Sequence, residues 1–452
     1  MSNSSKQGAS RYSGKTNVKF LLTASCVAIV GGLSFGYDTA IISGAIPYIS
    51  TYFELDGWAL GWAVGYMFLG CAAGSLIAGV LADKFGRRNM LIACAVFFAL
   101  TGLAAGISHR LYEFKLSRLI GGLSIGAVAL LSPLYIAELA PSALRGRLVA
   151  AYQLAIVFGI LLAYFAGSSL YGTGANNWRW MLVSQVILSG LFLLLVLMLP
   201  ETRSRQSDRA ANEGLLVVPM GSPGSADKEL TDSDDSFIVT GPVRFKQLFK
   251  PPYRRRLLIG ILVGVCQQLT GINAVLYYAP LVFKEMGVDA ATASLQTIEI
   301  GLAIVITAFI VIRPVDRLGR KKIMLAGSSL MGFSLAIVAL CFHNKYFDGY
   351  LAQAFLLLYV GIFSCTLGTA TWLYLAEIFP PHIRGWCMSV AILFLWLADF
   401  LITLSFPVMN KHLGMPLTLL CYACMCGIVF MLIRWKVQET KGFSVEEIPI
   451  TV

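Results

Sequence analysis

Long apolar stretches dominate the pattern of hydrophobic and polar positions along this chain. Each runs for about 20 residues with almost no charge, which is the length that an α-helix needs to cross about 30 Å of hydrocarbon. We expect helices, because open strands leave backbone polar groups unsatisfied in lipid. The pattern predicts twelve spans, at 18–48, 58–82, 89–107, 114–137, 146–170, 178–199, 255–284, 291–313, 321–342, 350–377, 385–408 and 413–434.

One long polar stretch interrupts this pattern at residues 201–253. It contains Ser, Asp, Pro and Gly with few large apolar residues, which is typical of a cytoplasmic connector. The chain is therefore predicted to be all-α, with a six-helix half at 1–200, the connector at 201–253, a second six-helix half at 254–436 and a cytoplasmic tail at 437–452.

Short charged signatures recur in the same order in both halves. The turn Asp-Lys-Phe-Gly-Arg-Arg at 83–88 is matched by Asp-Arg-Leu-Gly-Arg-Lys at 316–321. Two further pairs follow: Glu138 with Arg145 matches Glu377 with Arg384, and Glu201-Thr202 matches Glu439-Thr440. Their nearly constant separation indicates a duplicated half. Many transporters are duplicated membrane bundles, with the substrate site between the two repeats.

Composition excludes a soluble protein of this length, since 57% of the residues are hydrophobic and only 13% are charged. The net charge of +11 raises the possibility of nucleic-acid binding. Most Lys and Arg residues, however, fall in the predicted loops on the side that holds both termini. The positive-inside rule then places both termini in the cytoplasm. We expect a multi-pass protein of a bacterial inner membrane or plasma membrane, with lipid and no nucleic acid as partner.

No pattern of catalytic or metal-ligating residues stands out. The ten cysteines lie mostly in apolar spans, and Cys421, Cys424 and Cys426 fall on one hydrophobic helix without metal-ligand spacing. We see no nucleophile–base pair. An enzyme activity, a metal and a cofactor are therefore not predicted.

Asp38 and Arg118 form the sharpest candidate pair, because each lies well inside an apolar span. An ionisable group at the bilayer centre costs about 2.5–3.5 kcal/mol on insertion scales, so it normally faces a cavity and has a partner. An Arg keeps a neighbouring carboxylate ionised, and this support is lost when the pair separates. The pair predicts either proton coupling or a purely structural ion pair.

An amide set is predicted to contact a polar ligand, because amides both donate and accept hydrogen bonds and so suit sugar hydroxyls. Its members are Gln153, Gln267, Gln268 and Asn273. Tyr277 lies one helical turn after Asn273. Gln267 and Asn273 do not share one ideal helical face, so their convergence requires a break near Gly271. Hydrogen bonding between helices is the alternative interpretation.

Two tryptophans, Trp372 and Trp396, lie near the middle of predicted spans. An indole ring can pack against the apolar face of a sugar while its N–H donates a hydrogen bond, and core packing is the alternative. Glu299 and Asp399 are further ionisable residues inside spans and are candidates for secondary ionisable sites.

The charged signatures at the cytoplasmic helix ends predict a latch that holds the two halves in one state and releases them in another. Static helix caps and topology signals are the alternative. The predicted latch residues are Asp83, Arg87, Glu138, Arg145, Asp316, Arg320, Glu377 and Arg384.

These motifs resemble the sugar porter family of the major facilitator superfamily along nearly the whole chain. The resemblance includes Phe-Gly-Tyr-Asp at 35–38, Arg-Leu-Ile-Gly-Gly at 118–122, Pro-Leu-Tyr-Ile-Ala-Glu at 133–138, Gln-Gln-Leu-Thr-Gly-Ile-Asn at 267–273 and Glu-Thr-Lys-Gly at 439–442. The bacterial xylose–proton symporters are most similar. The resemblance implies that Asp38 is the proton-responsive acid, with Arg118 as its partner. It also implies sugar contacts from Phe35, Gln153, Gln267, Gln268, Asn273, Tyr277, Trp372 and Trp396.

Three polar positions of the family are apolar here, namely Ile160, Ile304 and Leu395. These departures favour a sugar or polyol other than xylose. We expect an alternating-access transporter for a monosaccharide, either a pentose or a hexose, or for a related polyol, coupled to protons. The alternatives are an uncoupled sugar facilitator and a sugar-sensing receptor on a transporter scaffold.

Overall fold

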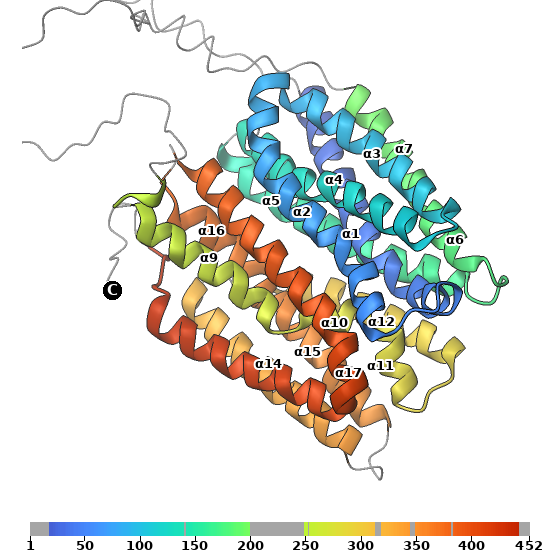
Figure 1. Cartoon of the computed structure of the whole chain (residues 1–452). Helices are drawn as coiled ribbons and strands as arrows, with labels where there is room; N and C mark the ends of the chain where they lie inside the picture. Colours follow the sequence, from blue (N-terminus) through green and yellow to red (C-terminus); the bar gives the residue numbers. More distant parts are fainter. Residues whose placement is uncertain are drawn as a thin grey trace, which may run out of the picture.

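The computed structural model of the protein describes residues 18–139, 142–198, 248–251, 253–311, 318–343, 349–380 and 383–442. Within these ranges the regular structure is helical and contains no strand (Figure 1). The predicted connector at 201–253 lies outside the described residues, apart from 248–251 and Tyr253. An all-α fold is confirmed.

The N-terminal half is built from the first six spans. Its helices are α1 (Val18–Tyr52), α2 (Gly57–Phe85), α3 (Arg87–Ile107), α4 (Leu111–Leu139), α5 (Ser142–Ser169), α6 (Asn177–Val183) and α7 (Gln185–Leu197). The last two form one span with an interruption at Ser184.

The C-terminal half contains more interruptions. Its helices are α9 (Tyr253–Leu269), α10 (Ile272–Tyr277), α11 (Ala279–Glu285), α12 (Ala290–Val311), α14 (Arg320–His343), α15 (Gly349–Cys365), α16 (Leu367–Ile378) and α17 (Arg384–Lys436). Gly414 breaks α17 with φ 76° and ψ 166°. Eleven helical stretches of the described chain are long and apolar enough to cross a membrane. Because the 53-residue α17 contains two spans, the twelve predicted spans are all present.

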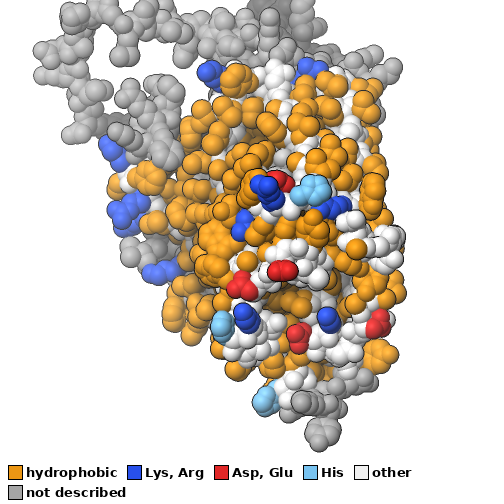
Figure 2. All heavy atoms as spheres, turned by 45° about the vertical axis from the view of Figure 1, so that its right-hand side comes forward, with side chains coloured by type: hydrophobic (Ala, Val, Ile, Leu, Met, Phe, Trp, Pro, Cys, Tyr) orange, Lys and Arg blue, Asp and Glu red, His pale blue; other side chains and the backbone are white. Residues whose placement is uncertain are grey.

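The surface has the apolar character of a protein that faces lipid. Figure 2 shows hydrophobic side chains over much of the visible face, with charged side chains gathered where the right-hand end of Figure 1 comes forward. Large apolar side chains stay exposed along the spans; Ile187 is 77% exposed and Leu194 is 63% exposed. Such exposure would be costly in water and is favourable against acyl chains.

The two halves meet mainly through two helix pairs, α2 with α17 and α5 with α12. Figure 1 shows α2 and the first part of α17 running beside each other. The second span is α2 in the N-terminal half and α12 in the C-terminal half. The fifth span is α5 in the N-terminal half and the first part of α17 in the C-terminal half. The two contacts are therefore equivalent under the duplication, since each joins a second span to the fifth span of the other half.

A stripe of glycines allows α2 to approach α17 closely. Gly57, Gly61 and Gly65 are spaced four residues apart and lie on one helical face. A Cβ at Gly61 would lie 2.5 Å from the carbonyl oxygen of Leu404, and one at Gly57 would lie 2.9 Å from that of Pro407. Small residues of this kind permit close helix packing in membranes.

We expect Gly61→Ala to lower the melting temperature of the purified protein, because the added methyl must displace the backbone of α17. Overpacking of this kind typically costs about 1–3 kcal/mol. Gly190→Ala on α7 is the matched control, since nothing lies within 4 Å of its added Cβ. Thermal unfolding of both variants in detergent tests this, and an unchanged melting temperature for Gly61→Ala would show that the halves are not in close contact at this point.

Candidate functional site

The seventh span is broken at the point where the sequence required it. Gly271 separates α9 from α10 and adopts the left-handed conformation, with φ 80° and ψ 11°. Glycine tolerates this conformation, whereas side chains disfavour it. A Cβ at this position would also lie 2.6 Å from the ring of Tyr422. The break brings Gln268 and Asn273 together from the two sides of Gly271.

Asn273 is the centre of a polar network. Its Nδ2 donates to Oε1 of Gln268 at 2.9 Å and to Oδ2 of Asp399 at 2.7 Å. Both N–H groups of the Asn273 amide are therefore in use. Its carbonyl oxygen and the NH₂ group of Gln268 are left to serve a ligand, as one acceptor and one donor.

Gln267 points to a different partner from its neighbour. Its Nε2 donates to the carbonyl oxygens of Leu367 at 3.2 Å and of Gly368 at 3.4 Å. These carbonyls lie where the tenth span is broken between α15 and α16, at Thr366 with φ −126° and ψ −97°. Gln267 thus joins the two broken spans of the C-terminal half. The sequence did not predict this second break.

An aromatic cluster lies between the two halves. Phe68 of α2 stacks on Trp396, with ring centroids 6.0 Å apart and planes 13° apart, and on Tyr277, with centroids 5.3 Å apart. Phe35 of α1 meets Trp396 edge-on at 6.0 Å. The indole N–H of Trp396 is buried and has no hydrogen-bond partner among the described residues.

This packing separates the roles open to the two tryptophans. One face of Trp396 is covered by Phe68, so Trp396 can serve a ligand chiefly as a hydrogen-bond donor. Trp372 on α16 is only half-buried, so part of its ring surface remains available for contact with a ligand. A stacking contact with an apolar sugar face is therefore better served by Trp372 than by Trp396.

Asp38 and Arg118 form a buried ion pair between α1 and α4. Nη1 of Arg118 lies 2.7 Å from Oδ1 of Asp38, and the two residues are 5% and 2% exposed. Nη2 of Arg118 also contacts the sulfur of Met67 on α2. The Nε of Arg118 has no hydrogen-bond partner among the described residues. The pair is thus charge-balanced but incompletely hydrogen-bonded, a state that costs more than a fully satisfied one.

The remaining predicted contact, Gln153, is half-buried on α5. The three apolar departures lie in the membrane-spanning helices, where Ile304 and Leu395 are buried and Ile160 is half-buried. No group of three or more His, Cys, Asp or Glu side chains that could hold a metal occurs within the described ranges.

Comparison with known protein families identifies the family of this chain. The sequence model of the family described as sugar (and other) transporter matches residues 24–451. The chain belongs to this family. It is a multi-pass membrane transporter with the major facilitator fold, and it is not an enzyme.

Relatives of this transporter cover nearly its full length. It is 34% identical to the arabinose-proton symporter of Bacillus subtilis over 95% of this chain and 94% of the relative. It is also 34% identical to the D-xylose-proton symporter of Escherichia coli over 96% of both chains. A further relative is the glucose facilitated diffusion protein of Zymomonas mobilis, at 32% identity over 93% of this chain and 95% of the relative.

Solved structures show the same fold. The inward-open xylose transporter of E. coli superposes with a TM-score of 0.78 at 32% identity, covering 95% of this chain and 99% of that one. The proton:xylose symporter bound to 6-bromo-6-deoxy-D-glucose superposes with a TM-score of 0.75 at 31% identity, covering 95% and 98% of the two chains. The predicted fold class is therefore confirmed by structures as well as by the family match.

Sequence reasoning provided no indication of one participant in the site, Phe68, and no indication of the contact that a second one, Asp399, makes. Phe68 gave no signal, because a phenylalanine in an apolar span is indistinguishable from core or lipid-facing positions. Asp399 was recognised as an intramembrane acid, but its contact with Asn273 joins residues 126 positions apart and depends on the break at Gly271.

The predicted latch is partly described. Arg320 at the start of α14 forms an ion pair with Glu377 at 2.7 Å, and its backbone N–H donates to Glu439 at 2.7 Å. Thr440 donates to the other carboxylate oxygen of Glu377. These contacts join the ends of three spans within the C-terminal half.

Other latch residues are described less fully. Arg384 donates from Nε to the carbonyl oxygen of Phe379 at 3.3 Å. Arg87 lies half-buried at the start of α3. Asp316 and the side chains of Asp83, Glu138 and Arg145 lie outside the described residues.

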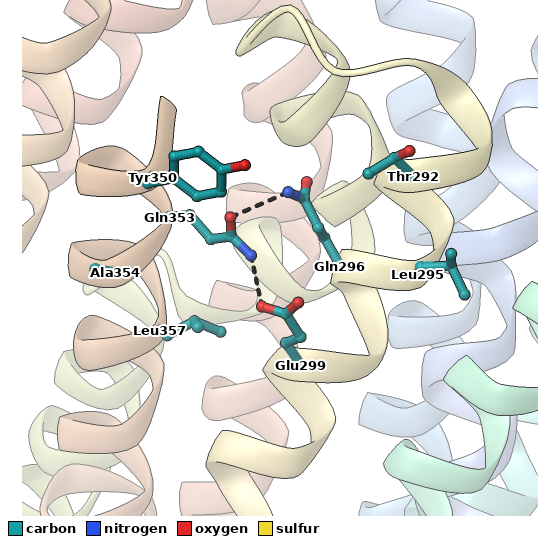
Figure 3. Close-up of a pocket in the computed structure, with 8 residues that line it drawn as sticks. All are labelled: Thr292, Leu295, Gln296, Glu299, Tyr350, Gln353, Ala354 and Leu357. Carbon is teal, nitrogen blue, oxygen red and sulfur yellow. Dashed lines mark hydrogen bonds between the residues drawn. The ribbon is translucent and has the colours of Figure 1, made fainter. Parts of the chain in front are cut away.

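Glu299 belongs to a separate polar pocket between α12 and α15 (Figure 3). Nε2 of Gln353 donates to its carboxylate, and Nε2 of Gln296 donates to Oε1 of Gln353 at 3.0 Å. The pocket is lined by Thr292, Leu295, Gln296, Glu299, Tyr350, Gln353, Ala354 and Leu357, none of which belongs to the predicted sugar-binding set.

We expect Gln268→Ala to weaken sugar binding by about 1–3 kcal/mol, because a sugar hydroxyl and the Asn273 amide then both lose a partner in a buried site. Gln296→Ala is the matched control, since it removes a glutamine of the same half from the separate pocket. Calorimetric titration of the folded variants measures the effect. If both variants bind as the parent does, the ligand does not contact Gln268.

Proposed function

We propose that this transporter moves a monosaccharide, a pentose or hexose, or a related polyol across the membrane by proton symport. The observation that carries the proposal is the buried Asp38–Arg118 ion pair in the half that faces the amide set. Relatives named as arabinose-proton and D-xylose-proton symporters support it.

The ion pair offers a direct means of coupling. While Asp38 is ionised, its attraction to Arg118 holds α1 against α4 in an environment of low dielectric constant. A proton on Asp38 removes this attraction and leaves Arg118 with an uncompensated charge that favours a wetter surrounding. Proton binding therefore shifts the balance between two arrangements of the N-terminal half.

The sugar site draws on both halves. Gln268, Asn273 and the N–H of Trp396 supply donors and acceptors from the C-terminal half. Phe35 and Gln153 lie on α1 and α5 of the N-terminal half. A ligand held between them favours closure of the halves around itself, and this is the basis of alternating access. The residues at 160, 304 and 395 are apolar and cannot hydrogen-bond a sugar hydroxyl. They therefore favour a sugar or polyol other than xylose.

We place the transporter in a bacterial inner membrane or a plasma membrane, with both termini in the cytoplasm and lipid around the spans. The excess of Lys and Arg on the side of the termini supports this orientation. Nucleic acid is not a partner under this proposal, because the basic residues follow the membrane topology.

The latch is proposed as a gate at the cytoplasmic helix ends. The contacts among Arg320, Glu377, Glu439 and Thr440 make the inner end of the C-terminal half one rigid unit. A rigid unit can dock against the duplicated turn at 83–88 of the other half and separate from it as a body. Docking closes the cytoplasmic side and corresponds to the outward-facing state.

We expect Asp38→Asn to abolish proton entry driven by sugar and to abolish uphill accumulation, while exchange of sugar across the membrane partly survives. The asparagine keeps the size of the side chain and cannot take up a proton. Uptake of a panel of pentoses, hexoses and inositols into proteoliposomes, with and without a pH gradient, measures this, and Asp289→Asn outside the spans is the control.

The same experiment separates the alternatives. A parent protein that equilibrates sugar but never concentrates it is an uncoupled facilitator, and one that binds sugar without moving it is a receptor. If Asp38→Asn accumulates sugar as the parent does, Asp38 is not the coupling group.

We expect Glu377→Gln combined with Arg87→Ala to shift the transporter towards the inward-facing state. A change from 1:99 to 99:1 needs about 5.5 kcal/mol, so loss of partly exposed pairs gives a partial shift. Spin-label distances across the cytoplasmic helix ends should lengthen in the double variant and stay unchanged in the control Arg434→Ala. Unchanged distances in the double variant would reduce the latch to helix caps and topology signals.

A further inference from the structure

Asp399 is a second buried carboxylate, on the opposite half from Asp38. It lies on α17, fifteen residues after the helix begins, or about 22 Å along the axis at 1.5 Å per residue, and is 0% exposed. Asp38 has Arg118 at 2.7 Å, whereas no Lys or Arg of the described chain forms an ion pair with Asp399. The two acids therefore differ in whether a neighbouring cation balances the negative charge of the carboxylate.

An unpaired carboxylate at such a position is expensive as an anion. Transfer of an isolated charge out of water costs several kcal/mol even after the protein relaxes, unless another charge or a proton compensates it. Hydrogen bonds from Asn273 at 2.7 Å and from Thr403 at 3.4 Å offset only part of this cost. Compensation must therefore come from a cation that reaches the site, of which the proton is the smallest.

The contact with Asn273 connects this charge to the ligand site. An ionised carboxylate can only accept hydrogen bonds, so it forces the NH₂ group of Asn273 towards itself and the carbonyl oxygen of Asn273 away. The same NH₂ group donates to Gln268 at 2.9 Å. The charge on Asp399 thereby determines which side of two amides is presented to a sugar.

A protonated Asp399 removes this constraint, because a carboxylic acid can also donate. It can then bond to the carbonyl oxygen of Asn273, and the amide is free to turn its NH₂ group to the ligand. Asn273 is the second residue of the short helix α10, which follows the break at Gly271. Protonation of Asp399 thus affects which hydrogen-bonding groups Asn273 presents to a ligand, and it acts on a residue of α10, the segment that follows the break.

We propose that Asp399 is a second proton-binding group of the transporter, in the C-terminal half, and that its proton is linked to sugar binding through Asn273. The proposal rests on the sugar transport proposed above. Asp399 is fully buried in the arrangement described here, which favours its protonated form. A sugar that stabilises this arrangement therefore favours proton uptake, and opening of the site to water releases the proton. Sugar binding should therefore take up a proton at this site as well as at the Asp38–Arg118 pair.

Two other titratable groups face Asp399 from the helices packed against it. Cys71 of α2 and Tyr277 of α10 both lie within electrostatic range of its carboxylate, and Cys71 is also within range of Asp38 and Arg118. A thiol and a phenol are ordinarily neutral below about pH 8, so neither supplies a proton change in the range of a carboxyl group. Cys71→Ser and Tyr277→Phe are therefore suitable controls for the assignment.

The test measures protons taken up when sugar binds to the full-length protein in detergent. D-glucose, D-xylose and myo-inositol are each added to weakly buffered protein that contains a pH indicator, in the parent, Asp38→Asn, Asp399→Asn and the double variant. We expect Asp38→Asn to take up a proton when sugar binds in detergent, although this variant no longer couples the proton to transport. The double variant should take up none, a difference of about one proton per bound sugar. Equal uptake by Asp38→Asn and the double variant overturns the proposal.

A second measurement does not need a substrate, so it can also be made on a variant that binds sugar poorly. Infrared difference spectra between acidic and alkaline pH detect the C=O stretch of a protonated carboxyl group in the folded, sugar-free protein. We expect one such band to disappear in Asp399→Asn, to shift in Asp399→Glu and to persist in Cys71→Ser and Tyr277→Phe. Its persistence in Asp399→Asn overturns the proposal, and so does a sugar affinity that depends on Na⁺ through Asp399 instead of on pH.

The two measurements also separate this inference from the function on which it rests. If none of the sugars binds but the infrared band depends on Asp399, the proton site stands and the proposed substrate class fails. If a sugar binds and is concentrated while the band is independent of Asp399, the proposed symport stands and the second site fails.

Discussion

Inside a bilayer a polar or charged group has no water to bind, and this constraint governs every notable feature of the structure. It makes each crossing a helix, since helices satisfy their own backbone. It also requires that any helix break be met by other groups. The break at Thr366 exposes carbonyl oxygens, and Gln267 binds two of them. At the break at Gly271, the hydroxyl of Tyr359 donates to the carbonyl oxygen of Thr270, and Asn273 lies against Asp399.

The two buried acids meet the same constraint with different partners. Asp38 is balanced by a cation whose position depends on the packing of α1 and α4. Among the residues that the structure describes, Asp399 is balanced only by amide and hydroxyl dipoles, which cannot cancel a full charge. With one buried acid in each half, the proposed symport has a candidate proton-binding group on both sides of the central site.

Duplication provides the geometry in which these groups meet. Each half joins its second span to the fifth span of the other, so two equivalent contacts form the larger part of the junction between the halves. Glycines at 57, 61 and 65 let one of these contacts come close to backbone distance. The aromatic cluster of Phe35, Phe68, Tyr277 and Trp396 fills the space between the halves near the amide set. A ligand held by the proposed amide set would therefore lie beside packing that already spans both halves.

Sequence alone determined the number of spans, the duplication and the presence of intramembrane charges, because each depends on local composition and order. The twelve apolar stretches agree with the helices to within a few residues at most ends, since hydrocarbon thickness sets their length. The sequence also predicted a break near Gly271, because Gln267 and Asn273 do not lie on the same face of an unbroken helix.

Only the tertiary structure decided which polar groups face one another. That Gln267 and Gln268 diverge, one to the tenth span and one to Asn273, follows from the two helix breaks together. That Phe68 covers a face of Trp396, and that Asp399 lies beside Asn273 with no cation of the described chain paired to it, follows from the crossing of α2, α10 and α17. Contacts between residues far apart in the chain depend on how helices cross, and the apolar faces that drive this crossing look alike in the sequence.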